Sequence, residues 1–148
     1  MFDVFSMPAR SAVTRAHSEA RRHGNDYIGT EHLLLGVLEG GGDDAVGKTL
    51  RSFRLTGEAI RSRVEDMIGP VGEPQPGHAP FSPRAKSALE RSRYEAQVPG
   101  HGQVEPPHIF AALMWQDQSA AAKAVASLGV KPTAIREHVL SYGQNTDG

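Results

Sequence analysis

Hydrophobic residues recur at helical spacing in four successive segments of the first half of the chain. Ser6 can cap a first helix, whose alanines share one side and which ends near Gly24. A second helix opens at Thr30, and a third covers about 44–53. Thr56 can cap a fourth. No run of residues alternates convincingly between apolar and polar at a period of two, so the pattern predicts helices and no strands.

The second half of the chain repeats the first. A shift of 76 positions gives ten identities within 28 positions, where composition alone gives roughly one in fifteen. After one deleted residue the match resumes at a shift of 75. The matched pairs include Phe5 with Phe81, Ser6 with Ser82, Arg15 with Arg91, Glu19 with Glu95, His32 with His108 and Arg61 with Arg136. We therefore predict an all-α domain of eight helices, built from two tandem four-helix repeats with approximate twofold symmetry.

The two repeats are predicted to share one core within a single domain, 1–148. The first repeat covers residues 5–69 and the second covers 81–143, and each alone would be small for an independent core. Residues 70–80 between them are rich in glycine and proline and form a linker over the surface.

Composition and charge exclude several classes of function. The formal net charge is -1, which argues against a protein that binds nucleic acid or an anionic membrane. There is no cysteine, so thiolate chemistry is excluded, and no basic, apolar leader precedes the first helix. Apolar runs such as Leu33–Leu35 are far too short for a membrane span. These features predict a cytoplasmic protein.

Residues 42–49, GDDAVGKT, match the phosphate-binding pattern G-x-x-x-x-G-K-[ST]. That loop works between a strand and a helix, whereas a helix is expected before it here, and two aspartates would repel a polyphosphate. In the second repeat Gly47 becomes Ala122 and Thr49 becomes Ala124. A small nucleotide-binding enzyme is therefore the weaker hypothesis, and we expect no cofactor.

Two segments carry a resemblance to a known family. Residues 25–40, NDYIGTEHLLLGVLEG, and residues 81–90, FSPRAKSALE, resemble the two repeats of the N-terminal domain of ClpA/ClpC-type unfoldases, the ClpC branch most of all. The resemblance covers residues 2–143. It implies a helical module, not an enzyme, that docks substrate and adaptor proteins onto a hexameric ATPase. The chain would then be either a stand-alone protein that modulates Clp-dependent proteolysis or an N-terminal fragment of a full-length Clp ATPase.

The resemblance gives Thr30 and Glu31 a role in binding arginine-phosphorylated proteins. A helix N-terminus attracts phosphate, and a carboxylate in the same turn attracts a guanidinium group. The alternative is that Thr30 is only the helix cap and Glu31 only a partner of the helix dipole. In the second repeat Pro106 and Pro107 replace them, which removes two N–H donors and the carboxylate. Glu105, one residue earlier, would point elsewhere.

A second surface is implied by the same family. Phe2, Phe81 and Lys86 correspond to positions that line a groove bound by cyclic peptide antibiotics in actinobacterial relatives. The alternative for Phe81 is that it packs the linker onto the first helix of the second repeat.

The remaining candidate residues favour structural roles. His32 and His108 occupy matching places without the partners of a metal or catalytic site, so each is expected to make a structural hydrogen bond. Trp115 is expected to be a partly buried packing residue. The basic residues 21–23 are expected to be a solvated helix end.

Calorimetric titration with a phosphoarginine peptide tests the asymmetry between the repeats. If the chain binds this ligand, we expect one site per chain, in the first repeat, because the prolines of the second repeat remove its donors. A stoichiometry of two would contradict this prediction.

Overall fold

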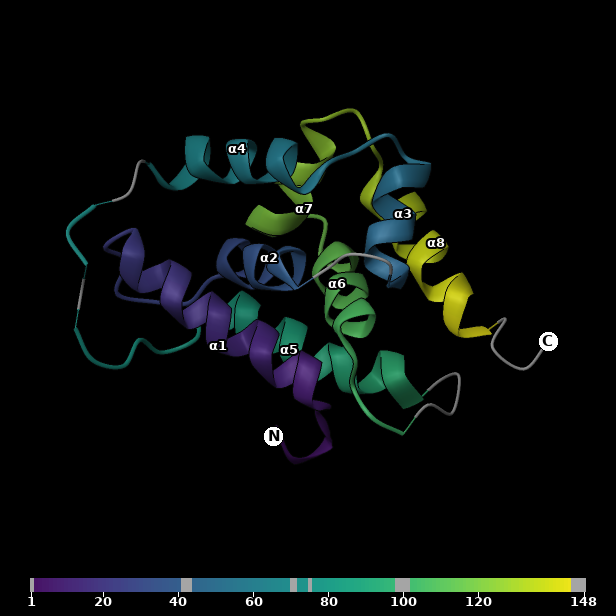
Figure 1. Cartoon of the computed structure of the whole chain (residues 1–148), viewed down its shortest axis with the longest axis horizontal. Coiled ribbons are helices and arrows are strands. Elements are labelled where there is room, and N and C mark those ends of the chain that lie inside the picture. Colours follow the sequence, from purple (N-terminus) through teal and green to yellow (C-terminus); the bar gives the residue numbers. More distant parts are fainter. Residues whose placement is uncertain (1, 41–43, 70–71, 75, 98–101, 145–148) are drawn as a thin grey trace.

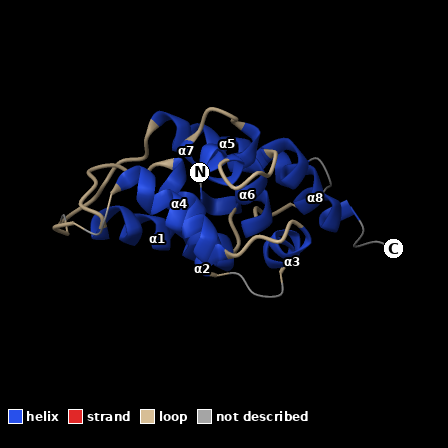
Figure 2. Ribbon diagram, turned by 90° about the horizontal axis from the view of Figure 1, so that it is seen from above, coloured by secondary structure: helices blue, strands red, loops and turns tan. Residues whose placement is uncertain are grey.

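The computed structural model describes the chain except for residues 1, 41–43, 70–71, 75, 98–101 and 145–148. The described residues form helices and no strand (Figure 2), as the sequence pattern predicts. The elements are a 3-10 turn Phe2–Val4, α1 Met7–Arg22, α2 Thr30–Glu39, α3 Ala45–Ser52, α4 Gly57–Ile68, α5 Pro83–Gln97, α6 Pro106–Trp115, α7 Ala120–Ala126 and α8 Pro132–Gln144. None of these helices is both long and apolar enough to cross a membrane.

Side chains cap several helices, and Ser6 and Thr56 do so as the sequence predicts. The hydroxyl oxygens of Ser6, Thr56 and Ser82 each accept a hydrogen bond from the amide three residues later, at 3.2, 3.0 and 3.1 Å. Asp44 caps α3 by accepting from the Gly47 amide at 3.0 Å. These contacts satisfy amides that have no partner within their own helix.

The segment that matches a phosphate-binding loop has a different structure. Residues 41–43 lie outside the described part, but α2 precedes the segment and Asp44 is the cap of α3. Lys48 is exposed on α3, and the side chain of Thr49 is buried and hydrogen-bonded to His138 at 3.2 Å. With a helix before it and its threonine turned inward, the segment does not form a phosphate cradle.

Helices α2 and α6 form the centre of the fold. All residues 30–37 of α2 and 108–114 of α6 are buried, so both helices are surrounded on every side. Figure 1 shows them in the middle of the molecule, with α1 and α5 on one side and α4 and α7 on the other. The two halves therefore contribute one helix each to a shared core.

Two short backbone pairings cross between the halves. Phe5 pairs in parallel with Val104, and Ile28 pairs in the same way with Phe81. The first pairing has hydrogen bonds of 3.0 and 2.8 Å, and the second has hydrogen bonds of 2.8 and 2.9 Å. Because the four residues are related by the 76-residue shift, each half gives the segment before its first helix to the other half.

Helix α2 approaches α1 most closely at Gly36. A Cβ atom placed on Gly36 would overlap the carbonyl oxygen of Ala12, and it would lie 3.0 Å from the amide nitrogen of Ala16. Backbone atoms in the middle of α1 cannot move aside as a flexible side chain can. The absence of a side chain at Gly36 therefore permits the observed packing of the two helices.

Replacing Gly36 by alanine should lower the free energy of unfolding by about 1–3 kcal/mol, because the added methyl group forces α1 and α2 apart. Gly57→Ala is the matched control, since a Cβ at Gly57 meets nothing within 4 Å, and it should be neutral or slightly stabilising. Chemical denaturation of both variants measures the difference. Equal stability of the two would contradict this account of the helix contact.

Candidate functional site

A groove of about 500 Å³ lies between α1 and the end of the linker before α5. Its lining is mainly apolar, with three polar groups from α1 and one histidine from the linker. The lining residues are Phe2, Arg10, Val13, Thr14, His17, Ile28, His78, Ala79 and Phe81. The volume is in the range of ordinary ligand pockets.

Backbone contacts fix the linker beside this groove. The Ile28 amide donates to the carbonyl of Pro80 at 2.8 Å, and the Ser82 amide donates back to Ile28 at 2.9 Å. The Ala79 amide donates to Nε2 of His17 on α1 at 3.3 Å. The wall of the groove opposite α1 is therefore held by hydrogen bonds at three successive points.

The structure brings together two of the three residues predicted for this surface. The rings of Phe2 and Phe81 lie 6.0 Å apart, and both line the groove. Lys86 is exposed on α5 and is not among the residues that line it. Phe81 also packs against the core and pairs with Ile28, so the structural and the binding interpretation both fit this residue.

Thr30 and Glu31 lie at the amino end of α2, but neither of them is the residue that caps the helix. The N-cap is Gly29. The Thr30 side chain is buried, at 2% exposure, and its Oγ1 accepts a hydrogen bond from the Ala121 amide at 3.2 Å. Thr30 therefore connects α2 to α7 of the second half, and its hydroxyl does not face solvent.

Glu31 keeps 7% of its surface exposed and folds back over the helix end. A Cβ on Gly29 would overlap Oε1 of this carboxylate, and the Tyr27 hydroxyl donates to Oε2 at 3.3 Å. Burial, together with the charge and hydrogen bond of Glu31, raises the pKa of Tyr27. The Glu31 carboxylate itself thus occupies the positive end of α2.

The paired histidines make the structural hydrogen bonds that their positions predict. Nδ1 of His32 accepts from the Gly29 amide, and Nδ1 of His108 accepts from the Glu105 amide, both at 2.9 Å. Because Nδ1 of His32 accepts, its proton is on Nε2, which donates to Asn25 at 2.8 Å. Burial, with a smaller effect from His23, lowers the pKa of His32 to about 4, so this side chain is neutral at pH 7.

Polar contacts cover the amino end of α6, which is the equivalent in the second half of the amino end of α2. Glu105 is the N-cap of α6, and its Oε1 accepts a hydrogen bond from Oγ of Ser6 at 2.7 Å. Pro106 and Pro107 form the first turn of α6. The Glu105 carboxylate therefore faces the start of α1, in another direction from that of Glu31.

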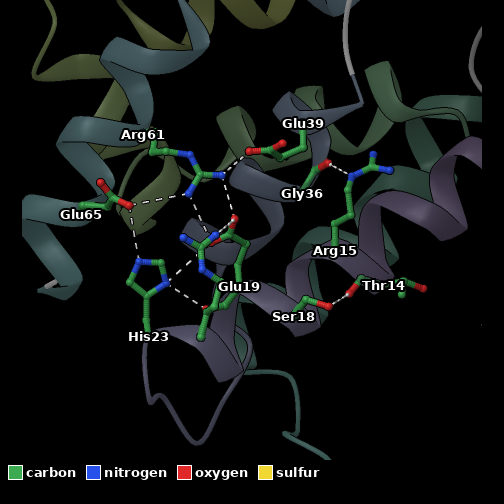
Figure 3. Close-up of polar contacts among 10 residues, drawn as sticks. Thr14, Arg15, Ser18, Glu19, His23, Gly36, Glu39, Arg61 and Glu65 are labelled. Atoms are coloured by element: carbon green, nitrogen blue, oxygen red, sulfur yellow. Dashed lines mark hydrogen bonds and ion pairs between the residues drawn. The ribbon is translucent and has the colours of Figure 1, made fainter. Parts of the chain in front are cut away.

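Each half also contains a buried carboxylate–guanidinium pair that sequence reasoning missed. Figure 3 shows Arg61 of α4 donating to both oxygens of Glu19 on α1, at 2.7 and 3.3 Å. In the second half Arg136 donates to Oε2 of Glu95 at 2.6 and 3.0 Å. All four residues are identical between the two repeats, and this identity is the feature of the sequence that points to them. They were not recognised as pairs because glutamate and arginine lie about 40 residues apart.

Further carboxylates surround the pair in the first half. Arg61 also donates to Glu39 at 2.5 Å, and it lies 3.7 Å from Oε2 of Glu65 (Figure 3). Burial raises the pKa of Glu19, but the hydrogen bond and charge of Arg61 outweigh this effect, so the pKa lies below its ordinary value. The carboxylate therefore remains charged although it is buried.

The expectation of a solvated helix end at 21–23 holds for Arg21 and Arg22, which are exposed, but it is wrong for His23. That side chain is buried, and its Nδ1 lies 2.9 Å from the Glu19 carbonyl oxygen. Trp115 is partly buried, but 47% of it is exposed, so it lies at the surface. Its position at the end of α6 and the stacked Arg91 side chain explain how it is held at the surface.

No cluster of three or more histidine, aspartate or glutamate side chains suited to a metal ion occurs in the described part of the chain. The geometry of the groove and of the end of α2 suits binding: an apolar groove with polar edges, beside a constrained carboxylate.

Comparison with known proteins shows which family model the chain matches and which proteins it resembles. The family model described as Clp repeat (R) N-terminal domain matches residues 4–98 and 80–147. The chloroplastic chaperone protein ClpC of Pisum sativum is 35% identical over 148 residues, which are 99% of this chain and 16% of that protein. The chain thus spans about a sixth of the length of this relative.

Solved structures share the arrangement of helices. The N-terminal domain of the chaperone ClpD from Arabidopsis thaliana superposes with a TM-score of 0.77 at 22% identity, over 96% of each chain. The ClpV N-domain, solved in complex with a VipB peptide, superposes with a TM-score of 0.67 at 19% identity, over 93% of this chain and 88% of that one. At these identities the likeness concerns the fold.

Protonation of His32 should make the stability of the protein depend on pH. The unfolded chain binds this proton below about pH 6.5, whereas the folded chain binds it only below about 4. Between these values the unfolded state binds more protons, so stability present above pH 6.5 is lost as the pH falls toward 4, by roughly 3 kcal/mol in all.

Denaturant unfolding at several pH values measures this loss. His32→Asn should reduce the pH dependence in this window, whatever its effect on stability at pH 7. His78→Asn, which changes an exposed histidine of the linker, is the control and should leave the dependence on pH intact. An unchanged pH dependence in the His32 variant would refute the assignment.

Proposed function

Because the chain belongs to the Clp repeat N-terminal domain family, we propose that it is a non-catalytic interaction module that binds segments of substrate or adaptor proteins. The observation that carries the proposal is the groove between α1 and residues 78–81. Two phenylalanine rings, Phe2 and Phe81, meet there on a surface open to solvent. Exposed apolar hollows with a polar rim are typical of protein-binding surfaces.

The chemistry of the groove favours a short peptide with an apolar side chain. Phe2, Val13, Ile28 and Phe81 provide apolar contact area. Arg10 lies at the same groove and already donates to the carbonyl of Phe5 at 3.1 Å, which fixes the direction of its guanidinium group. We expect an apolar anchor against the rings and an acceptor near Arg10. The peptide complex of the ClpV N-domain supports this type of ligand.

We propose a connection to Clp-dependent protein degradation on the basis of the ClpC relatives. As a module without its own ATPase, the chain would present bound proteins to an unfoldase or withhold them from it. As the N-terminal part of a longer ATPase, it would present them to its own motor. The groove serves the same purpose in both cases, because all of its lining residues lie within the described part of this chain.

We propose more specifically that the module binds phosphoarginine and that Glu31 contacts the guanidinium group of this ligand. The 7% exposure of Glu31 and its hydrogen bond from Tyr27 leave a carboxylate at the surface edge for a guanidinium group. A phosphate at the end of α2 would require this side chain to swing away from Gly29, since it covers the helix end. Glu31→Gln should therefore abolish the single calorimetric site predicted for a phosphoarginine peptide.

A cyclic peptide is a second ligand that the groove supports. The adjoining rings of Phe2 and Phe81 offer the apolar surface that such a ligand requires. Lys86 lies outside the lining, so a ligand would reach it only by extending beyond the groove onto α5.

Capture of proteins from a lysate of the source organism tests the module. Phe81→Ala should lose a defined set of partners, because it removes one wall of the groove while leaving the backbone pairing with Ile28. Met67→Ala is the matched control, since Met67 is an exposed apolar residue on α4, and it should retain the full set. Identical sets for wild type, Phe81→Ala and Glu31→Ala would contradict the proposal.

A further inference from the structure

The second half carries a cationic aromatic cluster on its surface, formed by Arg91, Tyr94 and Trp115. Tyr94 is 51% exposed and Trp115 is 47% exposed, more than any other aromatic residue in the described part. The guanidinium carbon of Arg91 lies 4.3 Å from the ring centre of Tyr94 and 4.4 Å from that of Trp115. Stacking on two rings fixes the plane of this cation, which reduces the entropy lost when an anion binds it.

Arg91 shares its carboxylate partner, Glu95, with Arg136. This carboxylate accepts two hydrogen bonds from Arg136. Nε of Arg91 lies 3.7 Å from the same oxygen and is buried without a hydrogen-bond partner in the described structure. Two guanidinium groups therefore share one buried carboxylate. This leaves an excess of positive charge, and Arg91 carries it beside the rings of Tyr94 and Trp115.

The first half lacks this excess of positive charge, although it contains the equivalent glutamate–arginine pair, Glu19 and Arg61. Arg15, the counterpart of Arg91, donates to the Gly36 carbonyl at 2.9 Å (Figure 3). Glu39 stands at the position of Trp115, and Glu65 stands at the position of Leu140. Both of these glutamates contact Arg61. The aromatic, cationic surface thus belongs to the second half alone.

The surroundings of the cluster reinforce its charge. Among the exposed residues of α5, the cations Arg84, Lys86 and Arg93 outnumber the single carboxylate of Glu90. A shallow hollow of about 570 Å³ adjoins the cluster, lined by Ser87, Glu90, Arg91, Trp115 and Gln116. The lining itself holds one cation and one carboxylate. The further exposed cations of α5 therefore favour an acidic segment of a protein, which carries carboxylates at close spacing and apolar side chains between them.

We propose that Arg91, Tyr94 and Trp115 form a second docking site, which binds an acidic peptide segment of a partner protein. A carboxylate pairs with the free edge of the Arg91 guanidinium group, and an apolar side chain packs against Trp115. This site goes beyond the function proposed for the groove. The hollow beside this cluster and the groove share no lining residue.

Trp115 provides the measurement, because it is the only tryptophan in the chain. The probe is a synthetic eight-residue peptide with four glutamates around a central leucine. We expect it to change the tryptophan fluorescence in a saturable manner, and more weakly as salt is added. The same peptide with glutamines in place of the glutamates should bind at least about tenfold more weakly.

Variants on α5 separate this site from general electrostatic attraction. Arg91→Ala should weaken binding about tenfold, whereas Arg93→Ala, which removes an equal charge from the same helix, should weaken it less than about twofold. Arg91→Lys keeps the charge without the planar group, so its affinity should lie between these limits. Phe81→Ala should leave this binding intact, which distinguishes it from a failure of the groove.

Several outcomes would overturn the proposal. Equal affinity for the glutamate and glutamine peptides would remove the role of charge, and equal loss in the Arg91 and Arg93 variants would remove the role of the stacked guanidinium group. Stronger binding of a single-stranded oligonucleotide would assign the surface to nucleic acid instead. Circular dichroism verifies that each variant is folded; if Arg91→Ala is not, Arg91→Lys decides, and affinity equal to that of wild type contradicts the proposal.

Discussion

The crossed backbone pairings are the constraint on which the rest of the structure depends. Phe5 pairs with Val104 and Ile28 pairs with Phe81, so each half supplies hydrogen-bond partners that the other half cannot supply to itself. Separation of the halves would leave four backbone hydrogen bonds unmade and would expose the central helices α2 and α6. Because buried backbone groups need hydrogen-bond partners, these pairings connect the two tandem copies directly to each other.

The candidate groove is a consequence of one of these pairings. The Ile28–Phe81 pairing directs the linker along α1 and leaves an apolar hollow between them. At the related pairing, Phe5 with Val104, the hydroxyl of Ser6 donates to Glu105 across the junction. The glycine at the corresponding position, Gly29, has no side chain to make that contact. A single exchange of glycine for glutamate thus gives the two junctions different contacts.

Local interactions account for what the sequence could predict. The serine and threonine caps and both histidine hydrogen bonds involve residues three or four apart, so their signals survive in the linear pattern. The partner of Thr30 is Ala121, 91 residues away, and no local pattern indicates it. Trp115 appeared to continue the apolar run of α6, but the helix ends there and its last residue lies beyond the core. The features that the local pattern does not predict are thus those that depend on where the helices end and pack in the folded protein.

The duplicated ion pairs explain how the halves could diverge without losing the fold. Glu19 and Glu95 are buried, so removing the arginine partner of either would leave a buried carboxylate without its compensating charge. The surrounding positions are more exposed, and changes there cost little. Glu39 and Glu65 add negative charge around one pair, while Trp115 and Leu140 take their places around the other. The same internal pair is therefore surrounded by further carboxylates in one half and by an arginine with two exposed aromatic rings in the other.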